Sequence, residues 1–137
     1  ISSLGNPREV SHYDVEDGSN HFALSHAKKI AYLASQQNGV QVLSISDEQN
    51  LTLVSNYQTP SDAHHLTLSK DEDTLYIASV RDGVHRVDTK DPYYLKHIQT
   101  YRLEKEASAF STQLDKDEKN LFISYGEAGL AKVELTP

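Results

Sequence analysis

Short apolar stretches recur along the chain at a nearly constant spacing, and polar residues that favour turns flank each of them. Three stretches share this pattern: 30–35 (IAYLAS), 74–79 (TLYIAS) and 120–125 (NLFISY). Their aromatic residues, Tyr32, Tyr76 and Phe122, are 44 and 46 residues apart. The glycines that follow keep the same spacing: Gly39, Gly83 and Gly129. Self-similarity at such a period indicates a repeat architecture.

In the middle repeat the local signals predict four β-strands: 65–69, 75–79, 84–89 and 95–101. Asp82-Gly83 favours a tight turn, since both residues tolerate positive φ, and Pro92 cannot continue a strand ladder. No stretch has an extended 3.6-residue apolar period, so helices are expected to be nearly absent. Four short antiparallel strands in about 44 residues are typical of one β-propeller blade.

The whole chain is predicted to be one all-β domain of propeller blades, built from three four-stranded antiparallel repeats. The 137 residues divide into four parts: an outer strand in 1–17, a blade at 18–62, a blade at 63–106 and a partial blade at 107–137. We expect residues 6–13 to form the outer strand of a blade that is completed at the other terminus. Propellers have about 4–8 blades. The chain is therefore expected either to pair with a second copy in a six-bladed ring or to be part of a longer propeller.

Composition narrows the possible functions. The net charge of −7 argues against a surface for nucleic-acid phosphates. The chain has no cysteine, which excludes disulfides and thiolate metal sites, and no methionine, so we expect it to be processed or excised from something longer. Apolar runs do not exceed five residues, against about 20 for a membrane span, so no membrane insertion is expected. Motifs for a nucleophile, a phosphate loop or a dinucleotide are lacking, and no cofactor is predicted.

The repeat resembles the LVIVD family of propeller repeats. The carriers are 63–66 (AHHL), 75–78 (LYIA), 83–88 (GVHRVD) and the exit Asp91-Pro92. The first repeat lacks the exit proline, and the third has Glu134 in place of the strand aspartate. The resemblance covers almost the whole chain. It implies a propeller fold and a location in surface or exported proteins, either extracellular or periplasmic, and it transfers no catalytic residues.

Two groups of polar residues are candidates for a site on one rim of the blades. One group stands at the entries of the first strands: His21, His64, His65 and Ser111. The other lies in the turns between second and third strands: Asn38, Arg81, Asp82 and Glu127. They could bind a partner or a metal ion, or the histidines could hydrogen-bond loop backbone and pack between blades. Neighbouring strand residues point to opposite faces, so His64 and His65 are not expected to hold the same ion.

The charged turns 70–73 and 115–120 are interpreted as solvated turns, because they lack the spaced oxygens and the glycine of a calcium loop. Three functions stay open. The first is a non-enzymatic binding or scaffold module that presents one rim to a protein or glycan. The second is a lactonase-like hydrolase with a divalent cation. The third is a purely structural segment of a larger exported protein.

Overall fold

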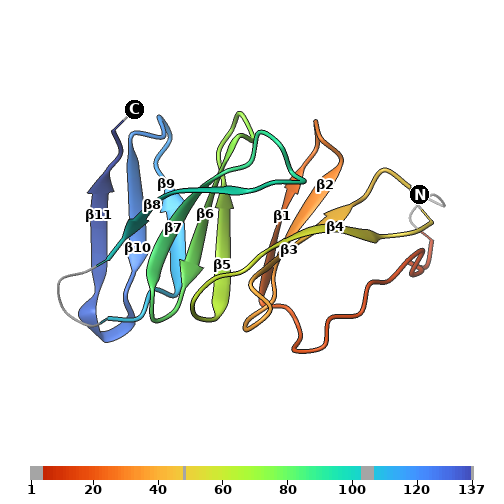
Figure 1. Ribbon diagram of the computed structural model, residues 1–137, viewed down its shortest axis with the longest axis horizontal. Coiled ribbons are helices and arrows are strands. Elements are labelled where there is room, and N and C mark those ends of the chain that lie inside the picture. Colours follow the sequence, from red (N-terminus) through yellow and green to blue (C-terminus); the bar gives the residue numbers. More distant parts are fainter. Residues whose placement is uncertain (1–4, 48, 103–106, 137) are drawn as a thin grey trace.

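The computed structural model describes residues 5–47, 49–102 and 107–136, and the chain is all-β (Figure 1). The strands in chain order are β1 (His21–Ser25), β2 (Ile30–Ala34), β3 (Val40–Ser44), β4 (Thr52–Tyr57), β5 (Ala63–Leu68), β6 (Thr74–Ser79), β7 (Gly83–Asp88), β8 (Lys96–Tyr101), β9 (Ser111–Leu114), β10 (Asn120–Ser124) and β11 (Leu130–Glu134). A single 3-10 turn, η2 (Gly126–Ala128), is the helical element of the described residues. None of their helices is long and apolar enough to cross a membrane.

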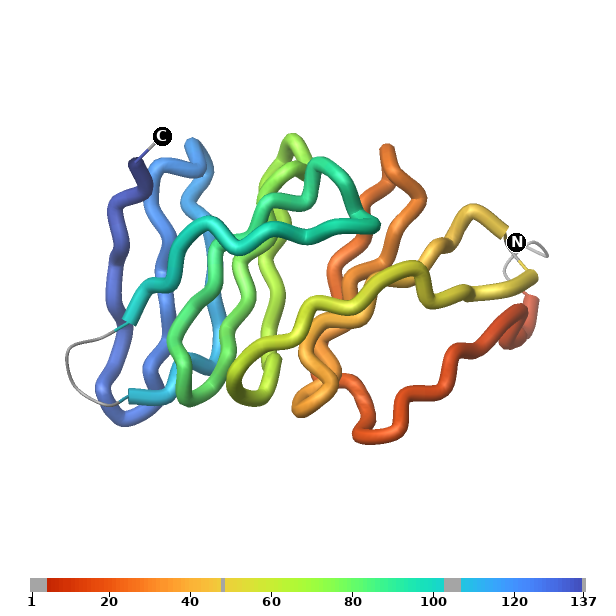
Figure 2. Tube along the Cα trace, in the orientation of Figure 1, coloured from red at the N-terminus to blue at the C-terminus, as the bar shows by residue number. Residues whose placement is uncertain are grey.

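The strands form three antiparallel sheets, each of which runs up and down in chain order. Strands β1–β4 make sheet 1, β5–β8 make sheet 2 and β9–β11 make sheet 3. Figures 1 and 2 show the sheets side by side, with sheet 2 between the other two. The predicted all-β class is confirmed, and the described residues form antiparallel sheets of four, four and three strands.

The sequence repeat is also a repeat of strand register. In each sheet the second strand is central and carries the aromatic residue in its middle: Tyr32 on β2, Tyr76 on β6 and Phe122 on β10. A register shift at 42–43 of β3 recurs at 86–87 of β7, 44 residues later. Sheets 1 and 2 therefore share the same register, including the shift between the third and the fourth strand.

Two apolar layers hold the sheets together. Between sheets 1 and 2 lie the buried side chains Ile30, Tyr32, Val42, Leu66, Leu75 and Ile77. Between sheets 2 and 3 lie Tyr76, Ala78, Val84, Leu121 and Ile123. Strand β6 contributes to both layers because its alternate side chains point to opposite faces, and five of its six residues are buried. The prediction that the repeated aromatic residues fill these layers is confirmed for Tyr32 and Tyr76.

Phe122 differs from the other two aromatic residues. It is only half-buried and lies outside both apolar layers, because no described sheet covers its face of sheet 3. The expectation that it also fills a layer between sheets is therefore not met among the described residues. The side chain repeats in sequence and register, but its burial depends on a neighbouring sheet.

Glycine is needed where the fourth strand passes close to the turn before the third strand. Gly39 and Gly83 have φ of 72° and 89°, a region that favours glycine. A Cβ atom at Gly39 would collide with the carbonyl oxygen of Tyr57, and one at Gly83 with that of Tyr101. A Cβ at Gly129 would meet no atom within 4 Å, because sheet 3 has three strands in the described part of the chain.

The N-terminal segment does not form the expected strand within this chain. Residues 5–20 contain no strand, and the segment runs beside sheet 1, at the opposite end of the array from β11 (Figure 1). The segment was predicted to pair with the last blade, but within one copy of the chain it lies too far from β11 to do so. That pairing stays a prediction.

Candidate functional site

The predicted site residues gather at one end of the sheets. Register places His21 opposite Ala34 and Ser111 opposite Ser124, next to the turns that join the second and third strands. An isolated bridge joins Gln36 of the first turn to the start of β5. We call this end the turn rim, and define it by the turns 35–39, 79–83 and 124–129 and by the first residues of β1, β5 and β9. The expectation that strand entries and turns share one rim is confirmed.

His21 and His65 stack on each other and join neighbouring sheets. Their ring centroids are 3.9 Å apart at an interplanar angle of 28°. Nδ1 of His21 accepts a hydrogen bond from Leu66 N at 3.3 Å, and Nδ1 of His65 accepts one from Thr112 N at 3.3 Å. Since an acceptor nitrogen carries no proton, both imidazoles are neutral in this arrangement, with the proton on Nε2. Each sheet is thus hydrogen-bonded to the next through an imidazole.

The surroundings of both rings oppose protonation. Burial, and then the neighbouring His64, lowers the pKa of His21. Burial lowers the pKa of His65 to about 4, and His21 and His64 add to the effect. A stacked imidazolium pair would be repulsive, and a protonated Nδ1 could not accept the backbone bond. These contacts support the structural interpretation of His21 and His65.

His64 points elsewhere. Its Nδ1 lies 3.2 Å from the carbonyl oxygen of Phe110, and the two rings meet edge to face at 5.8 Å. It therefore does not converge with His65 on a common point. Among the residues that the structure describes, no group of three or more His, Asp or Glu side chains is placed to hold a metal ion.

Ser111 occupies in sheet 3 the position that His21 and His65 occupy in sheets 1 and 2. It lines an open pocket of about 420 Å³ on the uncovered side of sheet 3, together with His65, Gln113, Phe122 and Leu130. The pocket mixes hydroxyl, amide and apolar groups. It lies on the face of sheet 3 that no described sheet covers.

The three turns of the rim share one backbone hydrogen bond and a closing glycine, and they differ in their side chains. Asn38 N bonds to Ser35 O, Asp82 N to Ser79 O and Ala128 N to Tyr125 O, at 2.8–3.2 Å. Positive φ recurs at Gly39, Gly83 and Gly129, where each turn ends. On this common frame Gln37, Arg81 and Glu127 are exposed, so successive turns present an amide, a cation and an anion.

Asn38 and Asp82 are already engaged within the chain. Asn38 Nδ2 donates to Asp17 Oδ2 at 3.4 Å. Asp82 is 8% exposed, and its carboxylate pairs with His85 Nε2 on one oxygen and with Arg102 Nη2 on the other. Although the sequence grouped Asp82 with the rim ligands, its carboxylate is not offered to a partner.

Sequence reasoning missed the rest of this buried cluster. His85 Nδ1 lies 3.4 Å from Tyr57 Oη, which donates to it when the imidazole is neutral, and this contact joins β4 of sheet 1 to β7 of sheet 2. Burial, and then the charge of Asp82, raises the pKa of Tyr57. The available signal was a histidine inside the apolar strand 83–88, three residues after an aspartate.

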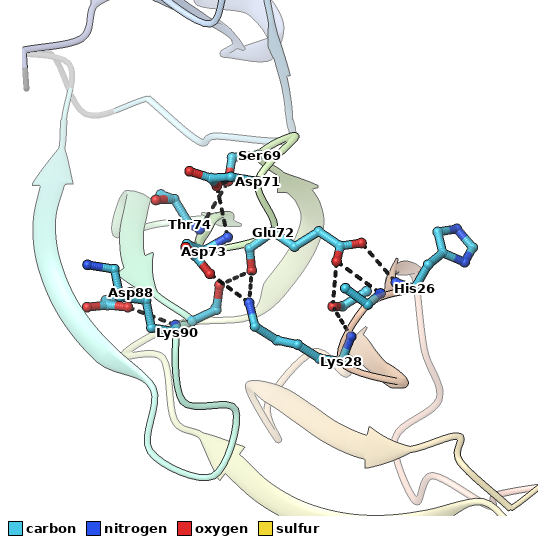
Figure 3. Close-up of polar contacts among 12 residues, drawn as sticks. His26, Lys28, Ser69, Asp71, Glu72, Asp73, Thr74, Asp88 and Lys90 are labelled. Carbon is cyan, nitrogen blue, oxygen red and sulfur yellow. Dashed lines mark hydrogen bonds and ion pairs between the residues drawn. The ribbon is translucent and has the colours of Figure 1, made fainter.

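The far end of the sheets holds a second set of contacts between sheets, centred on Glu72 (Figure 3). Its carboxylate accepts bonds from His26 N at 2.8 Å, Ser25 Oγ at 3.0 Å and Ala27 N at 3.2 Å, at the end of β1 and in the turn that follows it. Partial desolvation acts to raise the pKa of Glu72, but these bonds outweigh it and hold the pKa below its usual value. Lys28 Nζ reaches back to Asp73 Oδ1 at 2.8 Å.

The contact recurs one sheet later. Both carboxylate oxygens of Glu118, 46 residues after Glu72, lie 3.1 Å from Lys70 N in the turn of sheet 2. The solvated turns predicted at 70–73 and 115–120 therefore also fasten each sheet to the one before it. Their mixed charge gave no indication of this in the sequence, because the partners are backbone amides.

Comparison with known proteins yields a likeness of fold alone. No protein-family model and no curated protein matches the chain. Among solved structures it is similar to one described as a "putative 6-phosphogluconolactonase" from Bacteroides uniformis ATCC 8492. The TM-score is 0.73 at 19% sequence identity, over 87% of this chain and 37% of that one. The chain therefore spans little more than a third of that protein and shares the fold of that part.

Proposed function

We propose that the chain is an arc of a β-propeller of the LVIVD-repeat kind, and that it is a non-enzymatic binding module whose turn rim takes a protein or glycan partner. The observation that carries this proposal is that the three rim turns share one backbone hydrogen bond and a closing glycine but carry different exposed side chains. Binding residues are often found on loops that a rigid scaffold positions. The similarity to about a third of a larger protein supports the propeller arrangement.

The exposed groups of the rim suit polar recognition. Gln37 offers an amide, Arg81 a guanidinium and Glu127 a carboxylate, and all three are exposed. Such groups hydrogen-bond to sugar hydroxyls and pair with charged side chains. Next to these turns, the imidazoles of His21 and His65 accept backbone hydrogen bonds from the neighbouring sheet. These bonds hold the sheets together and fix the positions of the turns.

The test compares two triple variants. Gln37→Ala, Arg81→Ala and Glu127→Ala together remove an amide, a cation and an anion from the rim. Gln49→Ala, Lys116→Ala and Asp117→Ala remove the same three kinds of exposed group from turns at the other end. The wild-type protein is first applied to immobilised glycans and peptides, and the affinity for the best probe is then measured for both variants.

We expect the rim variant to lose affinity by about tenfold or more, which corresponds to about 1.4 kcal/mol, and the control variant to bind as the wild type does. Circular dichroism confirms that both are folded. Failure of the wild type to bind any probe, or equal loss in both variants, would contradict the proposal.

A second function is favoured by one observation, the name of the similar solved structure. A lactonase-like hydrolase would hold a divalent cation between carboxylates and imidazoles. The described residues provide no such group of three, so the ligands would have to include residues outside them. The assay is hydrolysis of 6-phosphogluconolactone with Mg²⁺ or with EDTA. We expect the spontaneous rate in both, whereas a faster rate that EDTA abolishes would overturn the non-enzymatic proposal.

A further inference from the structure

The first and the last sheet each leave one face uncovered, and each of these faces carries exposed apolar side chains. On sheet 3 this face carries the half-buried Phe122 and Leu130, which is 71% exposed. On sheet 1 it carries Phe22 and Leu24, which are 58% and 38% exposed. Single exposed apolar residues are ordinary, but here they stand in register on one face at each end of the array.

The uncovered face of sheet 1 is the side of the repeat that, in sheet 2, packs against the preceding sheet. The residues 44 positions after Phe22 and Leu24 are Leu66 and Leu68 of sheet 2. Leu66 is 2% exposed in the layer against sheet 1, and Leu68 packs against the same layer. The same side of the repeat is therefore buried wherever another sheet comes before it.

The uncovered face of sheet 3 is the side of the repeat that packs against a following sheet. Phe122 corresponds to Tyr32 and Tyr76, which are 0% and 3% exposed because the following sheet covers them. Leu130 corresponds to Val84, which is 0% exposed in the layer against sheet 3. The open face of sheet 3 thus lacks a following sheet, and the open face of sheet 1 lacks a preceding one.

The edge of sheet 3 is also incomplete. Within the described residues β11 pairs with β10 alone, whereas β3 and β7 each have a fourth strand on their other side. The space next to Gly129 is empty at the place where Tyr57 and Tyr101 pass Gly39 and Gly83. Residues 6–13 resemble 91–98, the segment that leads into the fourth strand of sheet 2, and they form no strand in their own chain.

Charge at the far-end turns is complementary as well. Lys28 and Lys29 of sheet 1 take the positions of Glu72 and Asp73 in the repeat. The corresponding turn of sheet 3, residues 115–119, carries three acidic residues and two lysines, a net charge of −1. A sheet 1 placed after a sheet 3 would therefore bring a cationic turn beside a turn of net negative charge.

We propose that these ends bind each other in trans. Sheet 1 of a second copy covers the Phe122 face of sheet 3, and residues 6–13 of that copy add a fourth strand to β11. By two-fold symmetry, sheet 1 and residues 6–13 of the first copy make the same contacts with sheet 3 of the second copy. The pair therefore leaves no sheet face or strand edge open at either end. The inference rests on the propeller arrangement proposed above and is independent of what the rim binds.

The experiment measures the mass of the 137-residue chain in solution by light scattering at micromolar concentration. We expect twice 15.3 kDa. Leu130→Glu on one face and Leu24→Glu on the other should each return the mass to that of one chain. Ile98→Glu is the matched control, since Ile98 is a 49% exposed residue on β8 of sheet 2, which carries neither open face, and its variant should keep the mass of the pair.

A second variant tests the edge alone. Leu135 N bonds to Lys119 O and Tyr125 N to Gly129 O, so the amide of Lys132 points away from β10. Lys132→Pro removes that donor, and we expect it to weaken the pair while the three-stranded sheet remains folded by circular dichroism.

A folded wild-type chain with the mass of one copy would overturn the inference, as would a species larger than two copies. A mass of one copy would show that other sheets, not a second copy, are needed to cover the face. Binding at the rim is measured separately on glycans and peptides, so either proposal can fail while the other stands.

Discussion

Tyr32 and Phe122 occupy the same place in the repeat but have different surroundings. Tyr32 is fully buried between sheets 1 and 2, whereas Phe122 lies on the open side of sheet 3 and is half-buried. Both sit in the middle of the central strand and point to the same side of their sheet. The difference shows that the repeat sets where a side chain points, while a neighbouring sheet sets how much it contributes to stability.

The largest expected effect separates these two residues directly. Truncation of a buried aromatic side chain costs about 3–5 kcal/mol, because it removes apolar contact and leaves a cavity. Tyr32→Ala should therefore lower the melting temperature by about 10 °C or more. Phe122→Ala should have a clearly smaller effect in the single chain. Equal losses in the two variants, measured by thermal unfolding, would show that the junctions are not packed as described.

The second comparison uses the glycines. Gly83→Ala places a methyl group against the carbonyl oxygen of Tyr101, and Gly129→Ala places one in open space. Both positions have positive φ, so both substitutions carry a strain of about 1–2 kcal/mol, and the difference between them reports the fourth strand. We expect Gly83→Ala to unfold at a much lower urea concentration. If a second copy covers β11, the loss for Gly129→Ala should grow with protein concentration.

A third variant tests the far-end contacts. Glu72→Ala removes the acceptor for Ser25 Oγ and for the amides of His26 and Ala27, so we expect a moderate fall in melting temperature. Asp117→Ala is the control, as it removes an exposed carboxylate from the equivalent turn of sheet 3. Since the bonds of Glu72 join two sheets, hydrogen exchange in the turn at 26–28 should also speed up. No change in exchange there would show that Glu72 does not fasten the sheets.

The smallest effect concerns pH. The pKa of His65 is about 4 in the folded chain against 6.5 for a free imidazole, so between these values the unfolded chain binds more protons. His65 therefore lowers stability as the pH falls from 6.5 towards 4, and its contribution is constant above that window. His21, whose pKa is also lowered, acts in the same direction, and the charges of His21 and His64 oppose the protonation of His65.

The matched variant is His65→Asn, whose amide oxygen can replace Nδ1 as acceptor without taking up a proton. Melting temperatures at neutral pH and at pH 5 should differ less for this variant than for the wild type. The same pH dependence in both proteins would show that His65 is not the titrating group.

Much of the fold followed from the sequence because apolar alternation and turn residues act locally. The four strands of the middle repeat were predicted to within two residues, and Gly39 and Gly83 stand where turns occur, whereas the strand expected at 6–13 did not form. The contacts between sheets could not be predicted in this way. Glu72 binds backbone amides 45–46 residues away. Since every residue other than proline has such an amide, the sequence does not show which one an acidic side chain binds.

The position of the candidate residues was predicted in part for the same reason. The repeat spacing placed His21, His65 and Ser111 at one rim, and register confirms that placement. It could not show that the imidazoles accept backbone bonds from the next sheet. Nor could it show that Asp82 turns inward to His85 and Arg102, since a turn residue followed by glycine normally faces solvent.

The central claim is that neighbouring sheets are joined by the same contacts at each junction, and the imidazole nitrogens of His65 report on one of them directly. In a ¹⁵N nuclear magnetic resonance titration of the imidazoles, we expect His65 to be neutral with its proton on Nε2, and to stay so until the pH approaches about 4. Protonation of His65 near 6.5, or a proton on Nδ1 at neutral pH, would contradict the bond from Thr112 N and with it the junction between sheets 2 and 3.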